Sequence, residues 1–538
     1  MSAPNSHLSL TAAGTPYDAR AARNALIVLA GMAMMVTYVE TMVIPAFKSF
    51  VIFFDDAPAT TVVWIVSAYL LVGTVATPIF GKLGDKYGKK RMLVVVMGLY
   101  AVAVSLAGFS PNIGAAFGVD RANQIYVLIG IRAFQGLGMG MFPLAFAMLP
   151  EVFPAARVGQ AQGIVSAMFA AGASVGLVGG GYIAYTWGWQ LTYHTVIPFA
   201  VALAVLAYVI LRESPHLTAA PIDYPGITSL GFALATVMFG LTEGAYWGWS
   251  NFSAVTFAGV PWGVPQFFIL AVVGLAFFLV WEPRTDHPVV SFAALKKRNI
   301  WISNVNGVFV GIGMFLTFIA LTILVEYPYK PGFGLNEFQM GLVSVPASLS
   351  MLALAPVWGR FVSARGPKPV MITGFAIMGL GSLGLLLFNS SIYELMLFVI
   401  PTLVGNVAVL IAMSNIIVLS VSPKELGIQT GMNQTFRNLG SAIGPVIAAT
   451  VTASYMTTIL VHVTGVPVLV PVPTYSIVGF ELVFGITSAL SAVGLLLSLG
   501  LRNYRFHADG SRLEPAATAP AEGATRPEEP AVSAGSGT

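Results

Sequence analysis

The stretch Gly81-Lys-Leu-Gly-Asp-Lys-Tyr-Gly-Lys-Lys-Arg91 places five cations, three glycines and one aspartate between two long apolar runs. The glycines at positions 81, 84 and 88 permit a tight turn. The cations suit a cytoplasmic loop between membrane spans, where Lys and Arg concentrate. Orientation in the membrane requires no acid, so Asp85 indicates a further role for this loop. The chain contains no G-x-x-x-x-G-K-[ST] phosphate-binding loop, and we therefore expect any pumping to draw on an ion gradient.

The composition is that of a membrane protein. The chain has 538 residues, of which 57% are hydrophobic and only 9% are charged, whereas a soluble protein carries about 25% charged residues. Apolar runs of about 20 residues, long enough to cross a bilayer, recur along the sequence. These runs predict an all-α polytopic membrane protein with fourteen spans, at residues 24–48, 60–80, 92–109, 124–149, 160–184, 190–211, 225–246, 264–282, 300–326, 338–361, 368–388, 393–421, 426–454 and 475–500.

The distribution of Lys and Arg predicts the orientation. Fourteen spans put both termini on one side, and 21 of the 26 basic residues fall on that side. The opposite side carries Lys48, Arg121 and Lys330, while Arg132 and Arg437 lie inside spans. By the positive-inside rule, both termini are cytoplasmic and the protein is a multi-pass protein of the cell (inner or plasma) membrane. Because the cations are spread over short loops, they do not indicate a nucleic-acid partner.

The chain repeats itself internally. Gly172 and Gly176 in span five recur as Gly440 and Gly444 in span thirteen, both displaced by the same number of positions. A parallel repeat of two six-span halves places a site at the bilayer midplane between them. The predicted parts are a cytoplasmic N-terminus (1–23), an N-terminal six-helix bundle (24–211), two inserted spans and a cytoplasmic linker (212–299), a C-terminal six-helix bundle (300–500) and a cytoplasmic tail (501–538) that is disordered from about residue 506.

The repeated glycines have the small-xxx-small spacing that allows helix backbones to approach closely. We expect Gly172, Gly176, Gly440, Gly444 and the adjacent Pro445 to act in helix packing. The segment from Gly172 to Gly176 also matches the G-x-S-x-G elbow of hydrolases, but that motif requires a strand-turn-helix context rather than a spanning helix. The six histidines are scattered and form no metal or nucleophile constellation. The sequence therefore argues against an enzyme.

Several of these motifs resemble those of one family. The loop from Gly81 to Arg91 resembles the signature between spans two and three of the major facilitator superfamily. The segment Ile129-Gly-Ile-Arg-Ala-Phe-Gln-Gly-Leu-Gly138 resembles its span-four motif, and the glycines from Gly163 to Gly176 resemble the span-five motif of its antiporters. Fourteen spans, the acid in Tyr38-Val-Glu-Thr41 and the segment Arg437-Asn-Leu-Gly440 resemble the drug:proton antiporter branch of QacA/EmrB type. The resemblance implies two six-helix bundles plus two inserted helices, and proton-coupled export by alternating access.

Two positions depart from that pattern. Leu177 stands where the family's span-five motif has proline, and the proline appears instead in the second half, at Pro445. Glu40 stands where span one of the family usually carries aspartate. Leu177 leaves a symporter open as an alternative. Glu40 keeps an acid at this position and changes the length of its side chain.

Glu40 is the acid that the sequence singles out. An ionisable side chain inside a span costs about 2.5–3.5 kcal/mol on insertion scales and is functional by default. Glu40 and Arg132 each lie about eight residues, or about 12 Å, from the outer face. We therefore predict that they approach each other in a central cavity, where proton and substrate compete for Glu40. A permanent structural ion pair is the alternative.

Helical spacing extends the candidate site from these two charges. A face rich in aromatic residues and methionine suits a bulky amphipathic ligand. The predicted substrate-cavity residues are Thr37, Ile44, Gln135, Met139, Phe142, Asn433, Arg437 and Glu481. The family resemblance implies that the loop acts as a gate, through Gly81, Gly84, Asp85, Gly88 and Arg91. It further implies that Asp85 locks onto the start of span thirteen near Pro423-Lys-Glu425 when the cytoplasmic side is closed.

The sequence thus predicts a proton-coupled exporter of amphipathic or cationic drug-like compounds. Its expected partners are a small-molecule substrate, protons and the lipid bilayer, and we expect a monomer with no cofactor and no metal. A carrier of lipids or of a specific metabolite, including a symporter, remains the nearest alternative. A non-transporting receptor is disfavoured by the gating loop and by charges at the depth of the cavity.

Overall fold

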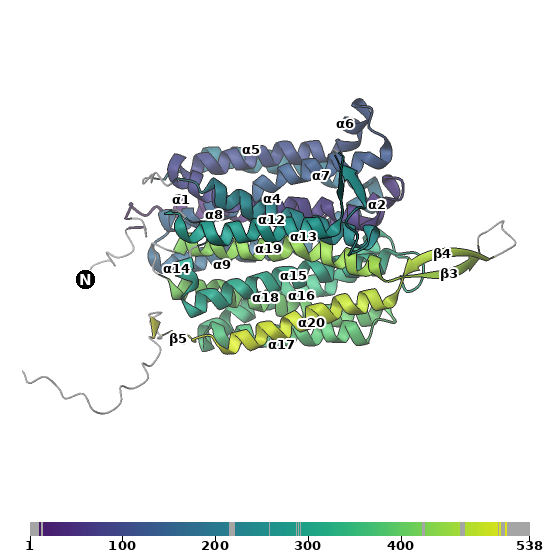
Figure 1. Cartoon of the computed structure of the whole chain (residues 1–538). Helices are drawn as coiled ribbons and strands as arrows, with labels where there is room; N and C mark the ends of the chain where they lie inside the picture. The colour runs from purple at the N-terminus through teal and green to yellow at the C-terminus, as the bar shows by residue number, and fades with distance from the viewer. Residues whose placement is uncertain are drawn as a thin grey trace, which may run out of the picture.

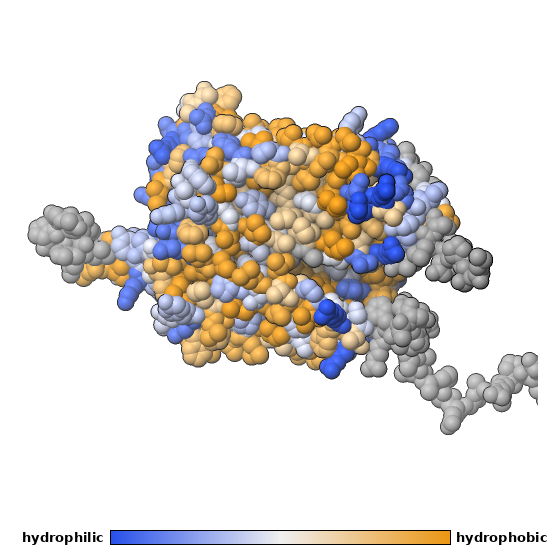
Figure 2. Space-filling model, turned by 180° about the vertical axis from the view of Figure 1, so that it is seen from behind, coloured by the Kyte–Doolittle hydropathy of each residue, from blue (hydrophilic) through white to orange (hydrophobic). Residues whose placement is uncertain are grey.

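The computed structural model describes residues 10–11, 14–214, 221–257, 259–286, 288, 290, 292–421, 426–462, 469–503, 505–506 and 512–513. Long helices run side by side in one bundle, and a β-hairpin projects from one end of it (Figure 1). We call that end the hairpin end. The opposite end, where the first helix begins and the last helix of the bundle finishes, is the terminal end. The bundle surface is largely apolar between more hydrophilic ends, as a membrane-embedded surface requires (Figure 2).

The chain begins with the helices of the predicted first half, and the predicted inserted part follows it. The first half contains α1 (Ala19–Thr41), η2 (Ile44–Ala46), α2 (Phe47–Phe53), α3 (Ala59–Val62), α4 (Trp64–Tyr87), α5 (Lys89–Gly108), α6 (Ser110–Ala116), η3 (Arg121–Asn123), α7 (Gln124–Gln135), η4 (Gly136–Gly140), α8 (Met141–Val152), α9 (Ala155–Trp187), α10 (Trp189–His194) and α11 (Ile197–Ile210). The inserted part contains α12 (Tyr224–Trp247), β1 (Val255–Phe257), β2 (Val260–Trp262), α13 (Val264–Trp281), η5 (Glu282–Arg284) and α14 (Phe292–Leu295).

The second half is built from longer, less interrupted helices. It contains α15 (Arg298–Glu326), α16 (Glu337–Arg365), α17 (Pro367–Leu387), α18 (Ile392–Ser420), α19 (Leu426–Ser454), β3 (Met456–His462), β4 (Leu469–Tyr475) and α20 (Ile477–Leu499), and the short strands β5 (Arg505–Phe506) and β6 (Arg512–Leu513) follow it. Most of the tail that the sequence predicts to be disordered lies outside the described residues.

Among the described residues, twelve helical segments are long and apolar enough to cross a membrane. Two further helices, α9 with 33 residues and α19 with 29 residues, pack among them. Every one of the fourteen predicted spans falls on one of these helices or on consecutive short ones. The prediction of an all-α polytopic membrane protein is confirmed, and the number of spans stays a prediction.

The contacts between helices repeat in the two halves. Helix α9 packs on α1 as α19 packs on α15, and α5 packs on α11 as α17 packs on α20. Between the halves, α9 contacts α16 and α19 contacts α4. A rotation that exchanges the halves exchanges these two contacts, as expected for a parallel repeat.

Close backbone approach makes the packing of α9 and α19 possible. A Cβ on Gly172 would overlap the Met34 carbonyl of α1, and a Cβ on Gly440 would overlap the Val308 carbonyl of α15. A Cβ on Gly176 would likewise overlap Thr41, and one on Gly444 would lie 2.8 Å from the Ile312 carbonyl oxygen. Pro445 lies within α19, one residue beyond this approach.

Three features of the fold go beyond the sequence analysis. Predicted span four is interrupted by η4, where a run of glycines lets the chain approach its neighbours, and a Cβ on Gly138 would overlap the Tyr100 ring. Short helices α2 and α6 lie at the hairpin end (Figure 1). Strands β3 and β4 pair in antiparallel fashion over seven residue pairs and form the hairpin that leaves the bundle.

Candidate functional site

Glu40 lies near the end of α1 with only 4% of its surface exposed. Its Oε2 atom is buried and accepts no hydrogen bond from the described residues. The carboxylate interacts electrostatically with two arginines, more strongly with Arg437 than with Arg132. We call these three residues the central charge cluster. A carboxylate with an open acceptor position inside a membrane bundle can take up a proton or a donor group of a ligand.

Arg132 is held firmly by the first half. Its Nε donates to the Ile65 carbonyl of α4 at 2.9 Å, and its Nη1 donates to Gln135 Oε1 at 2.8 Å. The guanidinium lies 4.5 Å from the Tyr69 ring centroid and 5.9 Å from that of Tyr193. Its surface is fully buried. These contacts fix Arg132 against α4, so that it supplies a stationary positive charge.

The expected approach of Arg132 to Glu40 therefore does not take the form of an ion pair. In the described part of the chain, neither arginine of the cluster lies within 4.0 Å of the Glu40 carboxylate. Arg132 Nε and Nη1 donate instead to the α4 carbonyl and to Gln135, which orients the guanidinium along α4, while its buried Nη2 has no partner among the described residues. The stronger partner of Glu40 comes from the other half of the molecule.

Arg437 reaches across the interface between the halves. It belongs to α19, is 8% exposed, and its guanidinium lies 4.4 Å from the ring centroid of Phe169 on α9. The Phe169 ring in turn packs edge-on against Phe142 of α8, with a centroid distance of 5.4 Å. Within the described residues the Arg437 guanidinium makes no hydrogen bond. Its N–H donors are thus available to a ligand or to water.

The remaining predicted cavity residues of the first half divide into two groups. Thr37 Oγ1 donates locally to the Ala33 carbonyl at 2.7 Å, whereas Gln135 accepts from Arg132 and its buried Nε2 has no partner among the described residues. Ile44 and Met139 are fully buried, and Met139 packs against Gly73 of α4. Both side chains are packed in this structure, and their role in a substrate cavity stays a prediction.

Glu481 is not brought to the charge cluster. It lies half-buried in the first turns of α20, which packs against α15, α17 and α19 rather than against α1. Asn433, in contrast, lies one turn from Arg437 on α19. Its Nδ2 donates to the Ser303 carbonyl at 3.3 Å and to Asn304 Oδ1 at 3.2 Å.

A polar seam runs along the second half, and of its residues only Asn433 was predicted from the sequence. Asn306 Nδ2 donates to Ser498 Oγ at 3.0 Å, and Asn406 Nδ2 donates to the Val310 carbonyl at 3.2 Å. With Asn304 and Asn433 these residues tie α15 to α18, α19 and α20. Their signal in the sequence is the presence of amide side chains within otherwise apolar spans.

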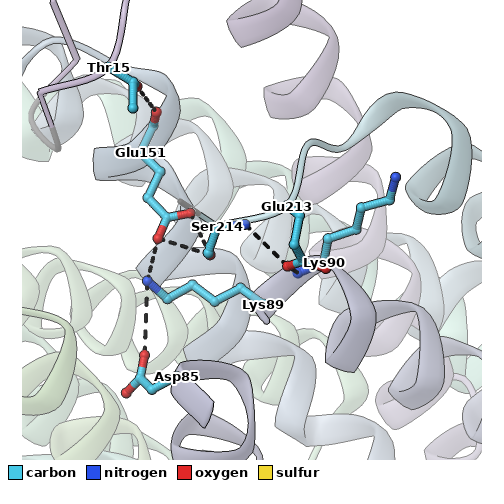
Figure 3. A network of polar contacts seen from close by, with 7 residues as sticks. All are labelled: Thr15, Asp85, Lys89, Lys90, Glu151, Glu213 and Ser214. Carbon is cyan, nitrogen blue, oxygen red and sulfur yellow. Dashed lines mark hydrogen bonds and ion pairs between the residues drawn. The ribbon is translucent and has the colours of Figure 1, made fainter. Parts of the chain in front are cut away.

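The loop from Gly81 to Arg91 forms a charged network at the terminal end (Figure 3). Lys89 lies 3.9 Å from the Asp85 carboxylate and 2.5 Å from that of Glu151, at the end of α8. Ser214 Oγ lies 2.8 and 3.0 Å from the two Glu151 oxygens. The network thus joins the α4–α5 loop to the ends of α8 and α11. Sequence reasoning missed Glu151 because it lies two spans away from Lys89 in the chain.

A second acid holds the start of α5. Glu213 accepts hydrogen bonds from the backbone N–H groups of Lys90 and Arg91 at 3.1 and 3.2 Å, and Arg91 Nε lies 3.6 Å from its carboxylate. A carboxylate there satisfies unpaired N–H groups at the helix N-terminus. Gly88 separates α4 from α5 with a φ of +102°, which favours glycine.

The other two loop glycines face α8. A Cβ on Gly84 would overlap Leu144, and one on Gly81 would lie 3.7 Å from Pro143. These positions let α4 lie close to α8. The predicted partner of Asp85, near Pro423-Lys-Glu425, lies outside the described residues, so the expected lock stays a prediction.

The described residues contain no group of three or more His, Asp and Glu side chains that could hold a metal ion. The site contains three charged side chains. They are one buried carboxylate on the first half, one fixed arginine of the same half, and one arginine on the second half.

Comparisons with known proteins agree with this architecture. The pattern of the Major Facilitator Superfamily matches residues 29–282 and 304–530. The chain is similar to the "Multidrug transporter protein MdtP" of Bacillus subtilis (strain 168), with 25% identity over 71% of this chain and 66% of that protein, so that it spans slightly less than two thirds of that relative. It is also similar to the "Tetracenomycin C resistance and export protein" of Streptomyces glaucescens, with 26% identity over 74% of this chain and 70% of that protein.

The fold also matches a solved structure. The human organic anion transporter MFSD10 (TETRAN) superposes with a TM-score of 0.58 at 14% identity, covering 89% of this chain and 99% of that chain. At this identity the likeness concerns the fold alone. Together with the family pattern, which covers most of the sequence, it leads to one conclusion: the chain belongs to the major facilitator superfamily, and it is a membrane transporter rather than an enzyme.

Proposed function

We propose that this transporter is a proton-coupled exporter of amphipathic or cationic compounds that works by alternating access. The observation that carries the proposal is the Glu40 carboxyl, which is buried between the halves with an unpartnered oxygen and interacts with Arg437 of the other half. The printed names of two relatives, a multidrug transporter and a resistance and export protein, support the same class of substrate.

The first step of the mechanism is electrostatic. An ionised Glu40 attracts Arg437 across the interface, and in a medium of low polarity such an attraction is strong. Binding of a proton removes the negative charge and with it the attraction between the halves. Protonation of one side chain thereby changes the relative free energy of the states in which the halves are together or apart.

The second step is competition. A cationic or hydrogen-bonding substrate gains most from the ionised carboxylate, whereas the proton abolishes it. Proton and substrate therefore bind the same group alternately, and alternate exposure of that group to the two sides gives exchange. A gradient drives the exchange only because the two ligands bind the two states with different affinity.

The charged network at the terminal end supplies the gate in this proposal, which takes the terminal end as the cytoplasmic side. The Asp85–Lys89–Glu151 contacts hold the α4–α5 loop in a defined position. Asp85 is then placed to engage the start of α19 when that side closes. Differential contacts of this kind are what allow a local charge to bias a global state.

The experiment uses proteoliposomes with an imposed pH gradient and a fluorescent lipophilic cation. Wild type is expected to accumulate the cation in a gradient-dependent manner, and Glu40→Gln is expected to lose this uptake. Glu243→Gln, which neutralises a half-buried acid on α12, is the matched control and should behave as wild type. Gradient-driven uptake that persists in Glu40→Gln would refute the role of Glu40 as the coupling acid.

The charge balance of the cluster favours a second candidate function. Two guanidinium groups face one carboxylate, and Arg437 has donors with no acceptor among the described residues. Guanidinium donors match carboxylate and phosphate groups well. The candidate is a carrier of lipids or of a metabolite with an anionic group, and a symporter falls within it. Movement of a fluorescent anionic lipid between leaflets, lost in Arg437→Gln and absent for the cation, would support this candidate over the first.

A further inference from the structure

A hollow of about 640 Å³ opens at the terminal end of the first half. It lies where the first turns of α1 and α5 meet the last turn of α11, and α11 packs against both of these helices. The charged residues in its lining are Asp18, Arg20, Lys90, Arg212 and Glu213. A hollow lined by charges of both signs can hold a charged group of a ligand only where one sign is in excess.

The two carboxylates of the hollow are already compensated. Asp18 lies 3.1 Å from Arg212 Nη2, and Glu213 lies 3.6 Å from Arg91 Nε. Asp18 also accepts hydrogen bonds from backbone N–H groups at the start of α1, and Glu213 does so at the start of α5. These acids therefore hold the beginnings of two helices, and the excess charge of the hollow is positive.

The two remaining cations have no acidic partner. In the described part of the chain, neither Arg20 nor Lys90 lies within 4.0 Å of a carboxylate oxygen. The Lys90 side chain extends away from Lys89 and from the network that holds Asp85 (Figure 3). Its Nζ atom lies 5.4 Å from the ring centroid of Tyr208, near the end of α11. The hollow thus offers two cations to an anionic group.

In the second half, the lysine equivalent to Lys90 is used by the protein itself. The displacement that carries Gly88 onto Gly366 also carries Lys90 onto Lys368, at the start of α17. Lys368 Nζ donates to the Leu499 carbonyl at the end of α20, with a distance of 2.7 Å. Among the described residues, Lys90 Nζ makes no such hydrogen bond to α11. The same position therefore carries a bonded lysine in one half and an available lysine in the other.

The junction of α15 with α20, which corresponds to that of α1 with α11, is sealed by further contacts. Asn299 Nδ2 donates to the Arg502 carbonyl at 3.0 Å, and Asn299 Oδ1 accepts from the Arg502 N–H at 2.9 Å. A Cβ on Gly500 would lie 3.2 Å from Arg298 Nη2, so that this guanidinium lies against the end of α20. The second half thus closes with its own side chains a place that the first half leaves open.

The surroundings place the hollow at the surface of the membrane. Tyr208 is exposed beside it, and tyrosine is enriched where a bilayer meets water. Val209 lines the hollow, and from it the exposed side chains of Val205 and Val201 continue along one face of α11. A cationic hollow that continues into an exposed apolar surface matches the two parts of a phospholipid.

We propose that the hollow binds the phosphate group of an anionic phospholipid whose acyl chains lie along the exposed valines of α11. Basic pockets between transmembrane helices bind anionic headgroups, and guanidinium and ammonium groups both donate charge-assisted hydrogen bonds to phosphate. A soluble phosphate ester has the same headgroup chemistry without the chains, and the apolar surface beside the hollow favours the lipid. The bound headgroup bridges α1, α5 and α11 and stabilises their packing.

The test uses the absence of cysteine from the whole chain. Val205→Cys carries a bimane fluorophore beside the proposed acyl chains, and Val493→Cys, exposed near the corresponding end of α20, carries it in the control protein. Each protein is reconstituted in phosphatidylcholine vesicles. Brominated phosphatidylglycerol or brominated phosphatidylcholine is then included at the same low mole fraction as a quencher.

We expect brominated phosphatidylglycerol to quench the fluorophore at Val205→Cys at least threefold more than brominated phosphatidylcholine, and both lipids to quench it equally at Val493→Cys. Arg20→Gln and Lys90→Gln should each weaken the apparent affinity for phosphatidylglycerol about fivefold, the effect of one cation near a membrane surface. Arg20→Lys keeps the charge and should retain the affinity, and Lys368→Gln is the matched control.

Three results would overturn the proposal. They are equal quenching by the two lipids at Val205→Cys, an unchanged preference in the double variant Arg20→Gln/Lys90→Gln, and an equal loss of affinity in Lys368→Gln. The last result would show that any cation at this end of the molecule attracts the lipid and that the hollow adds nothing.

A second measurement distinguishes the lipid from a soluble phosphate ester. Phosphatidylglycerol added to the detergent-solubilised protein should raise the unfolding midpoint, because a ligand bound to the folded state stabilises it, and the rise should be absent from Arg20→Gln/Lys90→Gln. Stabilisation by sn-glycerol 3-phosphate as large as that by phosphatidylglycerol would overturn the assignment to a lipid. Neither measurement involves transport, so the lipid site and the proposed function stand or fail separately.

Discussion

Replacement of Gly172 by alanine is expected to destabilise the transporter, whereas the same replacement at Gly163 is expected to stabilise it or leave it unchanged. Both residues belong to α9 and to the same glycine pattern. The structure separates them, because a Cβ on Gly172 would overlap the Met34 carbonyl of α1, while a Cβ on Gly163 would meet nothing within 4 Å.

The expected magnitudes follow from two opposing terms. Alanine inside a helix is favoured over glycine by about 1 kcal/mol, and this term applies at both positions. Insertion of a methyl group into a closely packed contact costs about 1–3 kcal/mol. At Gly172 the obstacle is the backbone of α1, which cannot rotate away as a side chain can. The net effect is a loss of up to about 2 kcal/mol at Gly172 and a gain of up to about 1 kcal/mol at Gly163.

Thermal unfolding in detergent, followed by the amount of monodisperse protein that remains on size-exclusion chromatography, measures both variants against wild type. The apparent midpoint should fall for Gly172→Ala and should not fall for Gly163→Ala. Gly440→Ala, whose Cβ would overlap the Val308 carbonyl, should repeat the first result in the second half. A midpoint for Gly172→Ala at or above that of Gly163→Ala would refute the inferred contact between the α1 and α9 backbones.

Three further predictions concern the charges and the gating loop. Arg437→Gln should abolish proton-coupled exchange in proteoliposomes, whereas Arg437→Lys should retain part of it. Lysine keeps the charge but loses the planar stacking on Phe169. Equal activity of both variants would contradict a role for this charge. Asp85→Asn should slow turnover and leave the equilibrium affinity for tetraphenylphosphonium unchanged, so that weakened binding would contradict a gating role. Gly88→Ala should lower the free energy of unfolding by about 1–3 kcal/mol and with it the apparent unfolding midpoint. The reason is that the φ of Gly88 is +102° and a Cβ would overlap the Glu213 carboxylate. A wild-type midpoint would contradict this.

The architecture was accessible from the sequence because membrane spans are constrained strongly by length and polarity. Each predicted span coincides with helix, since no other open structure satisfies the backbone within a bilayer. The hairpin of β3 and β4 was not predicted, because it lies beyond the bundle, where this constraint ends. The η4 interruption was missed for a related reason: hydropathy does not distinguish an α-helix from a 3₁₀ segment, and only the neighbours of Gly138 reveal why the chain tightens there.

The site was accessible in part. Glu40 could be identified because a carboxylate in an apolar span is costly and rare. Arg437 was predicted as a cavity residue, but its interaction with Glu40 was not, because equal depth of two charges does not determine the direction in which each side chain points. Arg132 turns to the Ile65 carbonyl of α4, and Arg437 comes from a helix of the other half, far away in the sequence. Glu151 and Glu213 were missed because their contacts to the loop are also remote in sequence.

The repeat explains why the central charge cluster contains residues of both halves. The displacement that carries Gly172 of α9 onto Gly440 of α19 also makes Phe169 the counterpart of Arg437, and these two residues touch. In a molecule with approximate two-fold symmetry, two equivalent residues in contact lie close to the axis. Arg437 therefore lies near the axis about which the halves exchange.

The counterpart of Glu40 follows from the same glycine contacts. Gly172 lies against Met34, and Gly440 lies against Val308. The displacement from Met34 to Val308 therefore relates α1 to α15. The same displacement places Met314 at the position equivalent to Glu40. Glu40 and Arg437 interact across the interface. Their equivalent positions in the repeat, Met314 and Phe169, are both apolar. Because Arg437 belongs to the other half, a change in the charge of Glu40 acts across the interface as well as on Arg132 of its own half. It must alter the attraction between the halves, which is the physical requirement for coupling a proton to their relative motion.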